Sequence, residues 1–184
     1  MTGELPKGIS VACVNNRVHA RVVGRGTFQN SQPLRQFALE KIDEGQEVFV
    51  IDLGPCQGMD STFLGMLAGI GLRLRQKGPT ACIHIVNINA HNMELLQTLG
   101  LDRLFLINTD APAFPSDTEY HHLPDTDITQ LRNPLDKDET ADLMIEAHDN
   151  LVRIDQRNTP RFKELARFLR ETVERRHANG SGRK

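Results

Sequence analysis

The residues with the clearest chemical potential are Asp60 and Ser61, which follow a Gly/Pro-containing loop and precede a helical pattern. A serine at the N-terminus of a helix lies among backbone N–H groups that have no helical partner, at the positive end of the helix dipole. Such a place suits a phosphate group, which adds about −1.5 to −2 charge at pH 7. The pattern therefore predicts a modifiable, accessible hydroxyl at Ser61. A purely structural interpretation stays open, because Asp and Ser are also preferred N-cap residues.

A strand and a helix must position this serine. The apolar run Val48–Leu53 predicts a strand buried on both faces, and the loop after it, Gly54–Gly58, lacks the Gly-Lys-Ser/Thr ending of a P-loop. Helical spacing follows over Thr62–Lys77 and stops at Gly78-Pro79. The same reasoning predicts, in order, a strand at Ala81–Ile88, a helix at Ala90–Leu99 that Gly100 ends, and a strand at Leu104–Ile107.

The N-terminal part of the chain predicts a hairpin and a helix. The apolar runs Ile9–Val14 and Arg17–Val23 are joined by two asparagines, which tolerate the positive φ of a two-residue turn, and Gly24 to Gly26 should end the second strand. A helix is expected to begin at Ser31 or Gln32, with Pro33 in its first turn, and to end before Gly45.

The order of these elements, ββαβαβαβ, sets the fold class. Strands separated by helices pair in parallel through right-handed crossovers, whereas the opening hairpin is antiparallel. The sequence therefore predicts an α/β protein with a mixed sheet, formed by residues 1–107.

Beyond residue 107 we predict an acidic, proline-containing connector at 108–135 and a helical hairpin at 136–184. Its helices should be about 20 and 17 residues long, the second beginning at Thr159-Pro160. Neither apolar face can remain in water, so the hairpin must dock on the core, on itself or on a partner. The apolar stripe of its first helix consists of Leu143, Ala147, Leu151 and Ile154.

Charge and cysteine content exclude several classes of protein. The net charge is −2, which gives no indication of nucleic-acid binding, although residues 108–150 hold 11 acidic and 2 basic residues and residues 151–184 hold 10 basic and 4 acidic ones. The acidic and basic segments should pair with each other. Three widely spaced cysteines favour a reducing compartment, and no signal region or membrane-spanning apolar run is seen. A soluble, cytoplasmic protein is the expectation.

Other candidate sites are weaker. His121, His122, Asp125 and Asp127 do not have the spacing of a standard metal site, and His84 within a strand is interpreted as a packed or face-exposed residue. No histidine lies near Ser61 in the sequence, so no catalytic triad is proposed. We therefore expect no metal, no cofactor and no enzymatic activity.

An ordered set of motifs from Val48 to Ile107 resembles the STAS domain of the anti-sigma factor antagonist family. That family shows a strand ending in Asp-Leu, Asp-Ser opening a helix that a glycine ends, a strand ending near Asn, and a Gly-Leu-Asp-x-Leu-Phe run. With the hairpin and first helix, the resemblance covers residues 8–107. In this chain the motifs are Ile51-Asp52-Leu53, Met59-Asp60-Ser61-Thr62, Lys77-Gly78, Ile85-Val86-Asn87 and Leu99-Gly100-Leu101-Asp102-Arg103-Leu104-Phe105.

The resemblance implies a regulatory protein that binds a serine-kinase anti-sigma factor and thereby releases a sigma factor. The kinase would phosphorylate Ser61, with Thr62 as an alternative acceptor, and a PP2C-type phosphatase would reverse the reaction. The implied partner-binding residues are Asp60, Ser61, Thr62, Phe63, Gly24 and Thr27.

The chain also departs from the family pattern. Phe63 stands where a glycine is common, and we expect its ring to reshape the kinase-facing surface. Gly26 and Thr27 stand where an aspartate often follows Gly24. Two other functions stay open: a constitutive STAS scaffold that forms a homodimer or larger assembly through its C-terminal helices, and a STAS subunit of a transporter that binds a small ligand or lipid in an apolar pocket.

Overall fold

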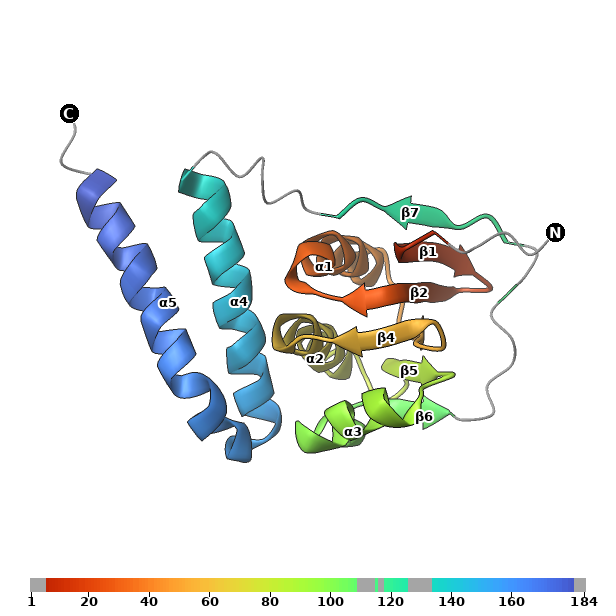
Figure 1. Ribbon diagram of the computed structural model, residues 1–184. Helices are drawn as coiled ribbons and strands as arrows, with labels where there is room; N and C mark the ends of the chain where they lie inside the picture. Colours follow the sequence, from red (N-terminus) through yellow and green to blue (C-terminus); the bar gives the residue numbers. More distant parts are fainter. Residues whose placement is uncertain (1–5, 109–114, 116–117, 126–133, 181–184) are drawn as a thin grey trace.

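A mixed sheet with helices on one face positions the candidate site (Figure 1). The computed structural model describes residues 6–108, 115, 118–125 and 134–180. The strands are β1 (Gly8–Val14), β2 (Arg17–Gly26), β3 (Val48–Asp52), β4 (Cys56–Met59), β5 (Cys82–Val86), β6 (Leu106–Asn108) and β7 (His121–Leu123). The helices are α1 (Phe28–Asp43), α2 (Ser61–Arg75), α3 (Ala90–Thr98), α4 (Pro134–Ile154) and α5 (Thr159–Gly180), with short 3-10 turns at Leu101–Arg103 and Gln156–Asn158.

The strand order is β6-β5-β3-β2-β1-β7, and β4 pairs separately with β2. The pairs β2–β3, β3–β5 and β5–β6 are parallel, whereas β1 pairs antiparallel with β2 and β7. This confirms the predicted fold class, a STAS-like mixed sheet with crossover helices and a C-terminal helical hairpin.

The N-terminal hairpin forms as predicted, with Asn15 and Asn16 at φ values of 50° and 59°. The predicted end of its second strand is wrong. β2 continues to Gly26 because its last residues pair with β4, where Gly24 lies opposite Cys56 and Gly26 opposite Met59. The region that we predicted to be only a loop therefore contains a short strand, which delivers the chain directly to Asp60.

Helix α1 begins at Phe28, earlier than predicted. Thr27 is its N-cap, and the Thr27 N–H donates to Oδ1 of Asn30 at 2.8 Å. Pro33 consequently lies inside the helix rather than in its first turn, and its ring nitrogen cannot donate to a helical carbonyl. The sequence prediction placed the proline by its usual position and missed the Thr27–Asn30 pair.

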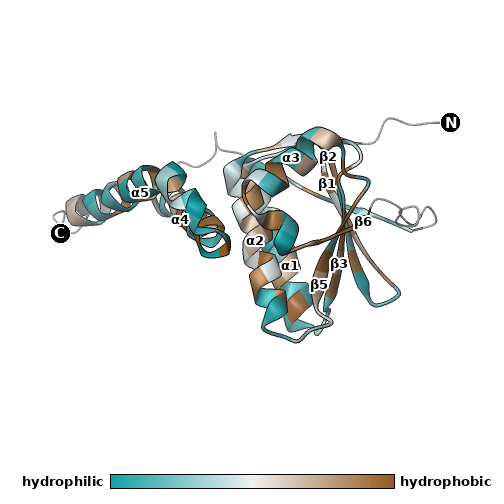
Figure 2. Ribbon diagram, turned by 90° about the horizontal axis from the view of Figure 1, so that it is seen from below, coloured by the Kyte–Doolittle hydropathy of each residue, from teal (hydrophilic) through white to brown (hydrophobic). Residues whose placement is uncertain are grey.

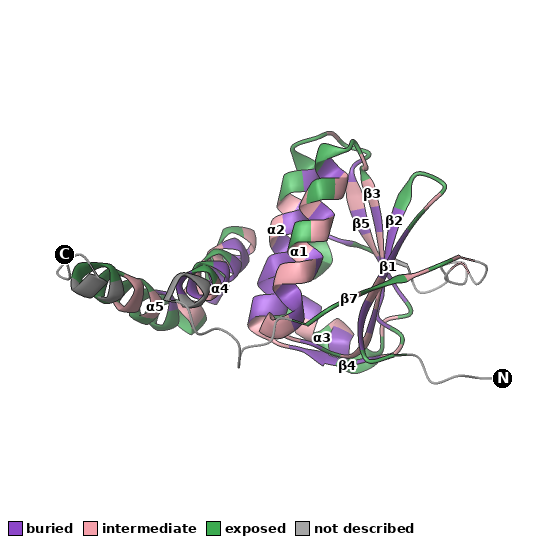
Figure 3. Cartoon of the chain, turned by 90° about the horizontal axis from the view of Figure 1, so that it is seen from above, coloured by how far each residue is buried: buried purple, intermediate pink, exposed green. Residues whose placement is uncertain are grey.

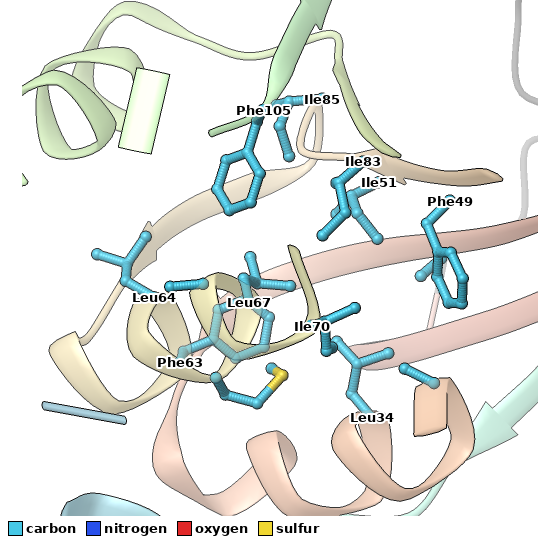
Figure 4. Packing of buried hydrophobic residues seen from close by; sticks show 14 of the residues in the cluster. Leu34, Phe49, Ile51, Phe63, Leu64, Leu67, Ile70, Ile83, Ile85 and Phe105 are labelled. Atoms are coloured by element: carbon cyan, nitrogen blue, oxygen red, sulfur yellow. The ribbon is translucent and has the colours of Figure 1, made fainter. Parts of the chain in front are cut away.

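The core lies between the sheet and helices α1 and α2. Figure 4 shows Phe49 and Ile51 of β3 and Ile83 of β5 facing side chains of α2 such as Leu67. All of these are at most 2% exposed. Because the helices cover only one face, β3 is not buried on both faces as predicted: its alternate residues Val48 and Val50 are only half-buried.

Strand β7 was not predicted, because its three residues lie in the segment that we interpreted as an extended connector. It pairs with the edge of β1, where Ile9 lies opposite Leu123. Much of the connector lies outside the described residues.

The helical hairpin forms a third layer, in which α4 packs on α2 and α5 lies on the outer side of α4 (Figure 2). The predicted stripe of α4 is the face in contact, since Leu143, Ala147 and Leu151 are at most 6% exposed. Figure 3 shows this buried face of α4 turned toward α2, while α5 is largely exposed. The hairpin thus docks on the core, one of the three possibilities left open by the sequence.

Glycines of α2 allow α4 to approach closely. A Cβ at Gly65 would lie 2.7 Å from Cα of Ala147 and closer still to its carbonyl group, and a Cβ at Gly69 would lie 2.6 Å from Nδ2 of Asn150. Asn150 also donates from Nδ2 to the Gly65 carbonyl at 3.3 Å. Small residues one turn apart permit such backbone contact between helices.

We expect Gly65→Ala to destabilise the protein by about 1–3 kcal/mol, because the added methyl group meets backbone atoms that cannot move aside. The sign of the change in the free energy of unfolding distinguishes the two cases, since Gly→Ala inside an unhindered helix stabilises by about 1 kcal/mol. Urea unfolding measures the change. Gly69→Ala is the matched control and should cost less, because the end of the Asn150 side chain can rotate away. A Gly65→Ala variant more stable than the wild type would contradict the close helix contact.

Candidate functional site

The site is built around the carboxylate of Asp60, which joins the N-termini of two helices. Asp60 is the N-cap of α2, and its Oδ1 accepts from the Phe63 N–H at 2.8 Å. Its other oxygen, Oδ2, accepts from the N–H of Phe28, the first residue of α1, at 2.9 Å. The structural role predicted for Asp60 is confirmed, and the second bond extends it to α1. A carboxylate at two positive helix ends is favourably placed for both dipoles.

A second carboxylate fixes the loop that leads to Asp60. Asp52, at the end of β3, is 3% exposed and accepts from Nε of Arg21 at 2.8 Å, from the Gly54 N–H at 3.0 Å and from Nδ2 of Asn87 at 3.0 Å. A buried carboxylate needs such partners to offset its lost hydration. The Asp-Leu and Asn motifs therefore hold the loop through hydrogen bonds.

Ser61 is the first residue of α2, as expected, but its hydroxyl group is not free. The side chain is half-buried, and Oγ lies 2.9 Å from Nε2 of His148 on α4. This differs from the accessible hydroxyl that we expected, because the C-terminal hairpin packs over the N-terminal part of α2.

His148 is enclosed by the hairpin. It is 2% exposed, and its ring lies against that of Phe162 on α5, with centroids 4.8 Å apart. Burial lowers the pKa of His148, although the backbone of Met144 and the carboxylates of Asp60 and Asp149 oppose this effect. The imidazole is therefore neutral at pH 7, and it can either accept from or donate to the Ser61 hydroxyl group.

A serine and a histidine at this distance form part of the arrangement found in nucleophilic enzymes. The third group is not seen here: among the described residues no carboxylate accepts from Nδ1 of His148. The ring is also covered on its outer side by Phe162. The contact has the features of a helix-packing hydrogen bond. Sequence reasoning missed it because 87 residues separate the two partners and no local pattern links them.

The structure brings most of the predicted partner-binding residues together. Thr27 immediately precedes Phe28, which donates to Asp60, so Thr27 lies beside the start of α2. Thr62 is 6% exposed, and Gly24 has a φ of 86° on β2, beside β4. No finding tests partner contact at these positions.

Phe63 does not lie on the surface. It is 0% exposed and its ring packs in the core, so the expected reshaping of a kinase-facing surface by this side chain is wrong. A Cβ at Gly26 would lie 2.6 Å from Cδ1 of Phe63, so the ring fills the space that a larger residue on β2 would need. Gly26 and Phe63, the two departures from the family pattern, are thus complementary, because the glycine leaves the space that the ring fills.

No group of three metal-ligating side chains is found among the described residues. His121 and His122 are exposed on β7, Asp125 is exposed, and Asp127 lies outside the described part of the chain. His84 has its Nε2 3.4 Å from Sγ of Cys82 on the same strand. All three cysteines are free.

In the part of the chain that the structure describes, no helix has the length and apolarity needed to cross a membrane.

Comparisons with known proteins agree with this architecture. Residues 9–108 match the family model described as Mlab, STAS domain. A putative anti-sigma factor antagonist from Thermotoga maritima is 18% identical, with a TM-score of 0.50, over 55% of this chain and 87% of that one. The anti-sigma factor antagonist SpoIIAA in its unphosphorylated form is 17% identical, with a TM-score of 0.50, over 56% of this chain and 90% of that one. No curated protein matches the sequence. The family match ends before β7, α4 and α5.

We expect Asp60→Ala to lower the free energy of unfolding by about 2 kcal/mol, because the N-cap of α2 and the acceptor for the first N–H of α1 are lost at once, each contributing about 1 kcal/mol. Asp60→Asn should cost about half as much, since its amide oxygen can accept from one N–H while its NH2 group faces the other. Urea unfolding of the two variants separates these cases. Equal losses for Ala and Asn, or a loss below 0.5 kcal/mol for Ala, would contradict the double cap.

Proposed function

The chain belongs to the STAS domain family, and we propose that it is an anti-sigma factor antagonist-type regulator that binds a serine-kinase anti-sigma factor and is switched by phosphorylation of Ser61. The single observation that carries this proposal is the position of Ser61 at the first residue of α2, directly after the N-cap Asp60. A phosphate there would meet the unpaired N–H groups and the positive dipole of the helix.

The burial of neighbouring residues supports Ser61 as the acceptor rather than Thr62. Ser61 is half-buried and its hydroxyl is hydrogen-bonded to His148 of the docked hairpin, whereas Thr62 is 6% exposed within the domain. A kinase can reach a hydroxyl group at the end of a helix more readily than one inside the first turn. A phosphate beside Asp60 would add like charge to the surface and weaken a contact with the kinase.

The test uses purified protein and the anti-sigma factor kinase proposed as its partner. Ser61→Ala should bind the kinase as the wild type does, whereas Ser61→Asp should bind at least ten-fold more weakly, which corresponds to about 1.4 kcal/mol. Isothermal titration calorimetry measures the affinities, and intact mass reports phosphate incorporation in the presence of ATP. Thr62→Val is the control for the identity of the acceptor, and it should still accept phosphate, because Ser61 is intact. Equal affinity of Ser61→Ala and Ser61→Asp would refute the switch.

A second candidate function is that of a constitutive scaffold that self-associates through α5. Two large apolar side chains of this helix, Leu165 and Phe168, are 42% and 59% exposed, and they lie one turn apart. Residues three apart share one face of a helix, so the two side chains form an apolar surface that a second copy of the chain could cover.

Light scattering tests this second function. If α5 mediates assembly, the wild type should be a dimer or larger, and Phe168→Ser should be monomeric. Leu106→Ser is the matched control, because Leu106 is 51% exposed on β6, away from the hairpin, and its replacement should leave the mass unchanged. A wild type that is monomeric at all protein concentrations would rule out the scaffold.

A further inference from the structure

The docked hairpin and a phosphate on Ser61 compete for the same space. Oγ of Ser61 is 2.9 Å from Nε2 of His148, a hydrogen-bond distance with no atom between them. A phosphoryl group adds a phosphorus atom and three oxygens beyond Oγ. The His148 ring occupies that volume, and Phe162 closes it from the outer side. With the Ser61 side chain in this orientation, the phosphate therefore fits only if His148 moves.

His148 cannot move by a small shift of α4. The preceding residue, Ala147, lies with its backbone directly on Gly65, where not even a Cβ can be accommodated, and Asn150 donates to the Gly65 carbonyl. These contacts lie within one turn of His148 on either side. Packed helices of this kind change between discrete arrangements rather than deform gradually.

The charges around Ser61 also oppose a phosphate in the docked state. Asp60 lies at the helix end with both oxygens already accepting N–H groups, and Asp149 follows His148 on α4. Asp149 is paired with Arg170 on α5 at 2.6 Å. Lys163 of α5 lines the same cavity as His148 and Arg170 but lies on its exposed side. A doubly charged group beside the Asp60 carboxylate, where His148 partly covers it, would add like-charge repulsion and a desolvation cost.

We propose that the α4–α5 hairpin is a displaceable cover over Ser61, docked while the serine is free and released once the serine carries a phosphate. This inference rests on the proposed function, because it describes how the same serine is regulated. A kinase can reach the hydroxyl only while α4 is away from α2, and the added phosphate then prevents the cover from returning.

Release would uncover a large apolar surface on both sides of the contact. On α4 it comprises Leu143, Ala147 and Leu151, and on α2 it includes Gly65 and Met66, all buried in the docked state. A partner that recognises the start of α2 must therefore compete with α4 for it. Free and phosphorylated protein would differ in the surfaces that they present, and not only in the charge at one residue.

Hydrogen exchange measured by mass spectrometry on the full chain tests the inference. Phosphoserine is placed at position 61 during synthesis with an expanded genetic code, so that no kinase is needed. We expect amides of α4 and α5 to exchange at least ten-fold faster in the phosphoserine protein than in the wild type, while β3, β5 and the C-terminal half of α2 keep their protection.

Two variants serve as references. Ala147→Leu leaves α2 intact but places a large side chain against Gly65, so it should show the exchange pattern of the undocked hairpin. Ser61→Ala removes the hydrogen bond to His148 without adding bulk or charge, and its α4 should stay as protected as in the wild type.

Slow exchange of α4 in the phosphoserine protein, as in the wild type, would overturn the inference whether or not a kinase modifies Ser61. Fast exchange of α4 in Ser61→Ala would also overturn it, because the hydrogen bond alone would then hold the hairpin. If phosphoserine releases α4 but the proposed kinase neither binds the protein nor modifies Ser61, the displaceable cover is supported and the proposed function is wrong.

Discussion

The arrangement of the site depends on the two hydrogen bonds of the Asp60 carboxylate. One bond caps α2, and the other accepts from the first N–H of α1, so a single side chain joins both helices at the same corner of the sheet. The Asp60 N–H in turn donates to the Gly26 carbonyl at the end of β2. Through these bonds the strand end, both helix starts and Ser61 form one rigid unit, and the position of the serine follows from the position of Asp60.

Glycines determine what can pack around this corner. Gly26 makes room for the ring of Phe63 inside the core, and Gly65 makes room for the backbone of α4 outside it. The first two turns of α2 thus lie between two close contacts, one with the sheet and one with the hairpin. On the hairpin side of this helix start, His148 lies against the Ser61 hydroxyl group.

The sequence was sufficient for features that depend on local chemistry. The paired asparagines of the first turn, the glycine at position 100 that ends α3, and the Asp60 cap each act on their immediate neighbours, and each was predicted. β4 and β7 could not be predicted, because strands of four and three residues exist only through the partners that they find on β2 and β1. The contact between Ser61 and His148 likewise could not be predicted, since no residue near either one in the sequence indicates the other.

The distance along the chain between Ser61 and His148 also has a consequence during synthesis. Every strand of the parallel part of the sheet precedes residue 109, whereas α4 begins at Pro134. The 87 residues that separate the two partners take roughly 4–17 s to translate at about 5–20 residues per second. Each newly made molecule therefore passes through a period in which the serine has left the ribosome and the histidine that covers it does not yet exist.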